Sequence, residues 1–117
     1  MAHHHLTGVT GEEMAAKYLL DKGYTILHKN WRHGHWEVDI IARRESKLHF
    51  IEVKTRRTGT FGFPEDDVSR KKIKNLIDAS EEFLVQYPHW KLIQFDIISI
   101  SLKNNEPEFF LIEDVYI

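Results

Sequence analysis

The spacing of apolar residues along the chain predicts two helices and about five strands. Helical spacing predicts one helix that begins between Thr7 and Thr10, where Thr10 and Glu13 have capping-box spacing, and ends at Gly23. A second helix begins after Ser69 and ends before Pro88. Short apolar runs between polar or turn residues predict strands at 24–27, 38–42, 48–53, 92–100 and 109–112. The order is therefore helix, three strands, helix, two strands. It indicates an α/β domain in which helices cover a mixed sheet.

A tight hairpin is predicted between the second and third strands, where the polar segment 43–47 separates two apolar runs. A four-residue loop at 44–47 is favoured because the segment has no Gly or Asn for a two-residue turn. With either loop length, a turn centred between Glu45 and Ser46 sets the register of the two strands.

This register brings charged residues of the two strands together. It places Asp39 opposite Glu52, and Glu37 opposite Lys54, with Cβ atoms roughly 5 Å apart. Two facing carboxylates repel each other at neutral pH, and a divalent cation between them is the simplest way to stabilise the pair. The alternative is an ordinary charge pair on a solvated strand, which is the commoner origin of a Glu-x-Lys sequence.

Composition favours one small globular domain spanning residues 1–117, with 1–6 as a disordered tail. Hydrophobic residues make up 42% and charged residues 29% of the chain, and no apolar run is long enough to span a membrane. The absence of cysteine excludes disulfides and thiolate zinc sites. Nothing at the N-terminus resembles a signal peptide, so a cytoplasmic protein is expected.

Net charge is −2, but positive charge is concentrated after the Glu-x-Lys segment. From Lys54 to Lys74 there are seven Lys or Arg residues and three acids. Such a stretch suits a polyanion drawn towards a metal, although a charge run is more often a solvated helix face. The polar and aromatic segment 30–35 adds groups suited to bases or phosphate, or to plain packing. The candidate nucleic-acid contacts are Arg32, Arg56, Arg57, Arg70, Lys71, Lys72 and Lys74.

Several motifs resemble the YraN family of uncharacterised small bacterial proteins. They are Gly11-Glu12 at a helix start, the segments 37–42 and 51–56, Phe61-Gly62-Phe63-Pro64-Glu65, and Phe95-Asp96. The similarity extends from about Leu6 to Ile100. That family is similar to archaeal Holliday junction resolvases, so the resemblance implies the restriction-endonuclease-like fold. One departure is Trp36, where the family often has Gly; a bulky residue there would reshape substrate access.

The resemblance also implies roles for individual residues. Asp39 and Glu52 would ligate Mg²⁺ or Mn²⁺, with the carbonyl of Val53 adding an oxygen. Glu12 would supply an outer-shell or second-metal carboxylate, whereas the sequence alone explains it by a favourable interaction with the helix dipole. Lys54 would orient or activate the attacking water.

Together these observations predict a metal-dependent endonuclease that hydrolyses DNA phosphodiester bonds. Branched or junction DNA is implied by the family alone. One chain supplies one site, so symmetric cutting of two strands would need a homodimer. The competing hypothesis is a nucleic-acid-binding module with the same fold that does not cut. A third is a protein-interaction domain that uses the loop at 61–63.

Overall fold

The computed structural model describes residues 10–57, 69–104 and 106–116. Its elements, in chain order, are α2 (Gly11–Asp21), β1 (Thr25–His33), β2 (Trp36–Arg44), β3 (Lys47–Arg57), α3 (Arg70–Gln86), β4 (Leu92–Lys103) and β5 (Glu106–Ile112). This order confirms the predicted α/β class. Within these ranges, no helix combines the length and the apolar character that a membrane crossing requires. The predictions for the tail at 1–6 and the loop at 61–63 lie outside the described residues.

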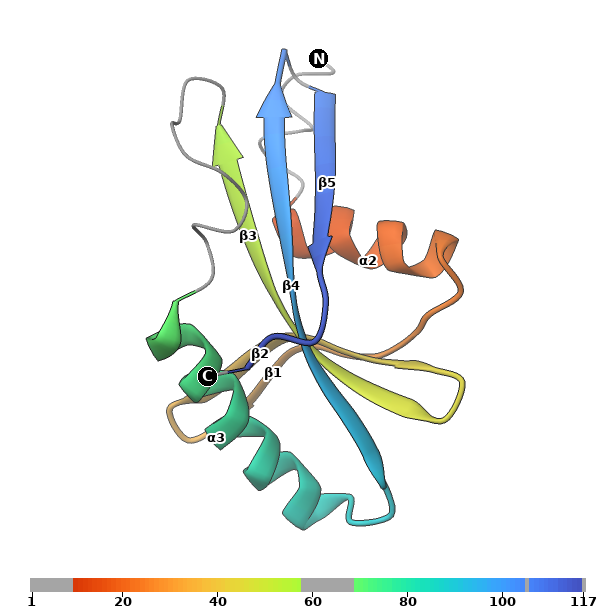
Figure 1. Ribbon diagram of the computed structural model, residues 1–117, viewed down its shortest axis with the longest axis vertical. Coiled ribbons are helices and arrows are strands. Elements are labelled where there is room, and N and C mark those ends of the chain that lie inside the picture. The colour runs from red at the N-terminus through yellow and green to blue at the C-terminus, as the bar shows by residue number, and fades with distance from the viewer. Residues whose placement is uncertain (1–9, 58–68, 105, 117) are drawn as a thin grey trace.

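The five strands form one mixed sheet in the order β1-β2-β3-β4-β5. Neighbouring strands are antiparallel except for β3 and β4, which are parallel. Their ladder runs from Lys47 beside Leu92 to Arg57 beside Leu102, and it forms the centre of the sheet. Figure 1 shows a strongly twisted sheet, with α3 along one part of it and α2 along another.

The two helices pack on opposite faces of the sheet, because successive side chains of a strand point to opposite faces. Leu19 of α2 belongs to a buried cluster that contains Ile40 and Ile51. Phe83 of α3 belongs to another, in which its ring centroid lies 5.6 Å from that of Phe50. Phe50 and Ile51 are adjacent in β3, so this strand separates two cores.

The predicted helix ends are confirmed. Thr10 and Ser69 each accept a hydrogen bond of 3.2 Å from the main-chain N–H three residues along, as N-cap residues do. Helix α2 ends before Gly23, whose φ of +93° is a conformation that glycine adopts without a Cβ penalty. The cap at Thr10 also determines that Glu12 lies in the first turn of α2.

Two strands extend further into polar sequence than predicted. The sequence predicts a connection at 30–35, but β1 continues to His33, and only Gly34 and His35 form the turn. Residues 55–57 likewise extend β3 beyond the strand predicted at 48–53. Main-chain pairing with β2 and β4 extends these strands, and it does not depend on the hydropathy of the side chains.

The hairpin between β2 and β3 has the predicted register but a shorter loop. Arg44 pairs with Lys47, which leaves Glu45 and Ser46 as a two-residue turn. The predicted four-residue loop is therefore wrong. Glu45 takes a φ of +56°, so a non-glycine residue adopts the left-handed conformation that this short turn requires.

Candidate metal and nucleic-acid site

Strands β2 and β3 remain paired as far as Ile40 and Ile51, the last pair of their ladder. The next residues are Asp39 and Glu52. In place of a further main-chain pair, Oδ2 of Asp39 accepts a hydrogen bond of 2.8 Å from the N–H of Val53. The ladder has the predicted register, but it ends before Asp39 and Glu52, so these two residues are not a main-chain pair and lie where the ladder ends.

Asp39 and Glu52 share one cavity of about 280 Å³. Its lining combines the start of β2 and the preceding turn, the middle of β3 and one side chain of α3: His35, Trp36, Glu37, Asp39, Glu52 and Asn75. Both acids therefore face the same space, as a shared cation requires. This space is the candidate site, called here the carboxylate cavity.

Glu37 pairs with β1 rather than with β3. It stands opposite Arg32 in the β1–β2 ladder, and 3.6 Å separate Oε1 of Glu37 from Nη2 of Arg32. On its other side, Glu37 has no ladder partner in β3, because the β2–β3 ladder ends at Ile40, so the predicted pairing of Glu37 with Lys54 is not formed. The ion pair is largely exposed and contributes at most about 1 kcal/mol to stability. It places Arg32, a predicted phosphate contact, next to a residue that lines the cavity.

The electrostatics of Asp39 favour a bound cation. Burial raises the pKa of Asp39 to about 6, against the opposing effect of the hydrogen bond from Val53. The negative charges of Glu12, Glu52 and Glu37 raise it further. A divalent cation would offset both the burial of this charge and the repulsion from the other acids.

Glu52 has a cationic neighbour on α3 that the sequence did not predict. Nζ of Lys72 lies 3.6 Å from Oε2 of Glu52. Burial raises the pKa of Glu52, and the charges of Lys72 and, more weakly, Lys54 oppose that effect. The sequence predicts Lys72 as a nucleic-acid contact rather than as a partner of Glu52. Lys72 lies three residues before Asn75, which lines the cavity, and this helical spacing is the signal that could have predicted a shared face.

Lys54 and Glu12, both predicted to be catalytic, are not among the residues that line the cavity. Lys54 is exposed and affects Glu52 through its charge. Glu12 lies in the first turn of α2, and its charge acts on Asp39.

The carbonyl of Val53 is the remaining predicted metal ligand. In an antiparallel strand pair the N–H and C=O of one residue face the same neighbouring strand, so the carbonyl of Val53 faces the same side of β3 as its N–H.

The predicted basic contacts lie on two further elements besides Arg32. They are Arg56 and Arg57 at the end of β3, and Arg70, Lys71, Lys72 and Lys74 at the start of α3. Arg70 and Lys71 are exposed. Lys74 forms an ion pair of 3.1 Å with Asp78 of the same helix, which offsets part of its charge.

The two carboxylates fit Mg²⁺ better than a metal that takes three or more ligands from protein side chains. Across the described part of the chain, no group of three or more His, Asp or Glu side chains is placed to hold a metal. Mg²⁺ is usually bound through one or two carboxylates, with waters and substrate phosphate completing its shell. Asp39 and Glu52 supply such a pair, and the resemblance implies the carbonyl of Val53 as a third oxygen.

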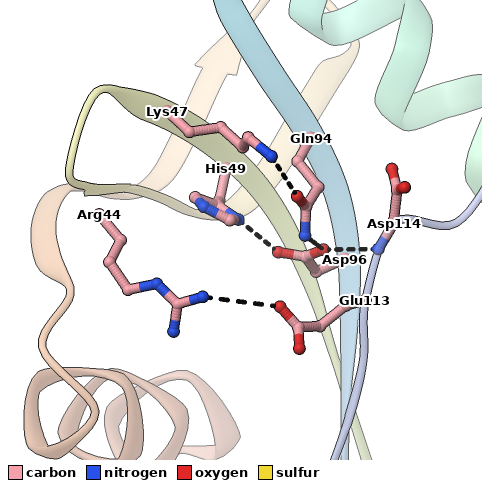
Figure 2. A network of polar contacts seen from close by, with 7 residues as sticks. All are labelled: Arg44, Lys47, His49, Gln94, Asp96, Glu113 and Asp114. Atoms are coloured by element: carbon pink, nitrogen blue, oxygen red, sulfur yellow. Dashed lines mark hydrogen bonds and ion pairs between the residues drawn. The ribbon is translucent and has the colours of Figure 1, made fainter.

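A second polar cluster, around Asp96 of β4, was not predicted from the sequence. Oδ2 of Asp96 lies 2.7 Å from Nδ1 of His49, and its Oδ1 accepts hydrogen bonds from Gln94 and from the main-chain N–H of Asp114. Figure 2 shows the side chains of His49, Gln94 and Asp96 directed towards one another. His49 and Asp96 are buried, and their polar atoms satisfy one another, so the cluster supports the fold. The signal that could have found it is an Asp inside an almost continuous apolar run.

Comparison with known proteins identifies the relatives of this chain. The profile of Uncharacterised protein family UPF0102 matches residues 11–100, which include Glu12, Asp39, Glu52 and Asp96. The chain belongs to the UPF0102 family. The resemblance to YraN proteins is thereby confirmed over nearly the range that the motifs indicated.

UPF0102 proteins from three bacteria illustrate the similarity. The chain is 46% identical to one from Phocaeicola vulgatus over 100 residues, covering 86% of this chain and 83% of that protein. It is 40% identical over 104 residues to one from Bacteroides thetaiotaomicron, covering 89% and 86%. It is 38% identical over 116 residues to one from Flavobacterium psychrophilum, covering 99% and 98%.

Proposed function

We propose that this UPF0102 protein is a metal-dependent nuclease that hydrolyses DNA phosphodiester bonds at the carboxylate cavity. The observation that carries the proposal is that Asp39 and Glu52, from adjacent strands, line one cavity where the β2–β3 ladder ends. Carboxylates held in this way suit Mg²⁺ or Mn²⁺. When bound, the ion would polarise a phosphoryl oxygen and lower the pKa of the attacking water.

The chain's own residues would position the reacting groups. The hydrogen bond from Val53 holds the carboxylate of Asp39 before substrate binds, which reduces the ordering needed at the reactive geometry. Lys72 holds Glu52 from the side of α3. Lys54 lies two residues after Glu52 on the same face of β3, where its ammonium would stabilise negative charge that develops on the phosphate.

Basic side chains around the site support a nucleic-acid partner. Arg70 and Lys71 are exposed at the start of α3, one turn or less from Lys72. Lys and Arg side chains beside a carboxylate site attract a phosphate backbone. Branched DNA, a homodimer that cuts two strands, and a cytoplasmic setting belong to the same proposal.

The test is a cleavage assay of the purified chain on branched, single-stranded and duplex DNA, with Mg²⁺, Mn²⁺ or a chelator. We expect metal-dependent cleavage that falls by at least about 100-fold in Glu52→Gln and in Asp39→Asn, while DNA binding persists. The matched control is Glu108→Gln, which removes an exposed carboxylate of β5 outside the cavity.

Two results would contradict the proposal. One is cleavage that survives both cavity substitutions, since it would place the reaction elsewhere or reveal a contaminant. The other is DNA binding without cleavage of any substrate, weakened by salt but unaffected by metal or by Glu52→Gln. That second result would support the competing hypothesis of a binding module.

A further inference from the structure

Trp36 forms a wall shared by two cavities at the start of β2. One is the carboxylate cavity, and the other has a volume of about 310 Å³. The second, called here the α3 cavity, is lined by Trp36, Asp78, Glu81, Glu82 and Val85. Trp36 is half-buried, so part of its indole is accessible from these spaces.

The ring of Trp36 is held in place by its surroundings. It packs against the buried cluster that contains Phe50 and Phe83. The ring of His35 lies next to it, with centroids 4.2 Å apart and planes inclined by 40°. The two-residue turn that precedes it includes Gly34 at a φ of +61°, and it closes on the ladder pair of His33 with Trp36. A fixed aromatic ring with an accessible surface can stack on a nucleobase.

Charge along α3 separates the two cavities chemically. The first turns carry Arg70, Lys71, Lys72 and Lys74, and the later turns carry Asp78, Glu81 and Glu82. Lys74 offsets only part of this acidity, through an ion pair of 3.1 Å with Asp78. A phosphate backbone is attracted to the first turns and repelled by the later ones. A nucleobase is neutral and meets no such repulsion.

We propose, building on the nuclease function above, that Trp36 stacks on an unpaired nucleobase adjacent to the phosphate that is cut. The phosphate then lies at Asp39 and Glu52, and the base lies on Trp36 at the side of the α3 cavity. A base inside a continuous duplex has both faces covered by its neighbours, so only an unstacked base can make this contact. The substrate class is therefore DNA with an unpaired nucleotide at the cleavage position, such as a bulge, a single strand or a frayed end.

The first test measures stacking without catalysis. Glu52→Gln protein is titrated with a short single-stranded oligodeoxynucleotide in the absence of metal, and tryptophan fluorescence is recorded. We expect quenching on binding. Trp36→Leu in the same background should lose the quenching and bind roughly 5- to 100-fold more weakly, whereas Trp36→Phe should keep most of the affinity. Trp90→Leu is the matched control, because Trp90 packs on the same cluster but lines neither cavity.

The second test compares cleavage of a duplex with one unpaired nucleotide and of its fully paired equivalent. The native protein should cleave the first substrate faster. The ratio of the two cleavage rates should fall by about tenfold in Trp36→Leu and should be retained in Trp36→Phe. Circular dichroism and thermal unfolding confirm that each variant is folded. If Trp36→Leu does not fold, Trp36→Phe decides the test, because it should keep the affinity but lose the quenching, and quenching that persists in Trp36→Phe would overturn the proposal.

The outcomes separate the two proposals. Quenching that depends on Trp36, without metal-dependent cleavage of any substrate, would support stacking and contradict the nuclease function. Metal-dependent cleavage with the same binding, quenching and substrate preference in folded Trp36→Leu would overturn the stacking proposal and leave the nuclease function standing.

Discussion

The main-chain N–H of Val53 donates a hydrogen bond of 2.8 Å to Oδ2 of Asp39. It does so directly after the last ladder pair, Ile40 with Ile51, so a side chain satisfies a donor of β3 that main-chain pairing would otherwise satisfy. Asp39 therefore ends the hairpin and also faces the proposed metal. The negative charge of Asp39 lowers the stability of the metal-free protein because it is buried, whereas the proposed metal requires that charge.

Asp39→Asn is expected to stabilise the metal-free protein at neutral pH. Burial raises the pKa of Asp39 to about 6, so the folded state binds this proton more tightly than the unfolded chain does. The stabilisation that comes from this tighter proton binding is complete below the unfolded pKa of about 4, and it is lost as pH rises through about 6. Asn carries no charge, and its Oδ1 can still accept the hydrogen bond from Val53. We expect a gain of about 1–2 kcal/mol in the free energy of unfolding at pH 7.5.

Urea unfolding at pH 7.5 and near pH 4 measures this effect, and the gain should shrink towards zero at the lower pH. Asp39→Ala is the control, because it removes the charge and also the acceptor for Val53. A gain of the same size at both pH values would show that burial of the Asp39 charge is not its origin.

Lys72→Ala is expected to strengthen metal binding by the free protein. The ammonium of Lys72 lies 3.6 Å from Oε2 of Glu52 and competes with a divalent cation for that carboxylate. Its removal should lower the dissociation constant for Mn²⁺ by about fivefold, since a partly exposed ion pair contributes about 1 kcal/mol. Calorimetry in the absence of DNA measures the change. Lys71→Ala, an exposed neighbour on α3, should leave Mn²⁺ affinity nearly unchanged, and an equal effect of the two variants would indicate a general effect of charge.

Asp96→Ala is expected to destabilise the protein by about 3–5 kcal/mol, because it leaves the buried His49 and the main-chain N–H of Asp114 without their acceptor. Chemical unfolding measures the loss, and hydrogen exchange at Asp114 should accelerate. Asp21→Ala is the control, since its ion pair with Lys17 is exposed and contributes less than about 1 kcal/mol. Similar losses in both variants would refute the structural role of the buried cluster.

Gly11→Ala is expected to destabilise the protein by about 1–3 kcal/mol, although Ala normally favours a helix. A Cβ at this position would overlap with Oγ1 of Thr55 on β3. The overlap would push the first turn of α2, and with it Glu12, away from the sheet. Thermal unfolding of the single variants and of Gly11→Ala/Thr55→Ala forms a double-mutant cycle. Truncation of the Thr55 side chain should recover part of the stability lost in Gly11→Ala. Strict additivity of the two changes in the free energy of unfolding would exclude this contact as the cause.

Much of the local structure was predictable because its determinants lie close together in the sequence. Thr10 and Ser69 cap the helices through bonds to N–H groups three residues away. The β2–β3 register follows from the position of the hairpin turn. The length of β1 was not predictable in the same way, because its polar end at residues 30–33 is a strand only where β2 supplies main-chain partners.

By itself, the sequence determined the α/β class, the order of the elements and the presence of Asp39 and Glu52 near the end of one hairpin, since each depends on short-range spacing. Only the tertiary structure decided that α3 brings Lys72 and Asn75 to these acids, and that β4 brings Asp96 to His49. Residues far apart in the chain meet through the packing of helices and the pairing of parallel strands. The physical reason is that both depend on the whole set of buried contacts, which no local pattern of residues encodes.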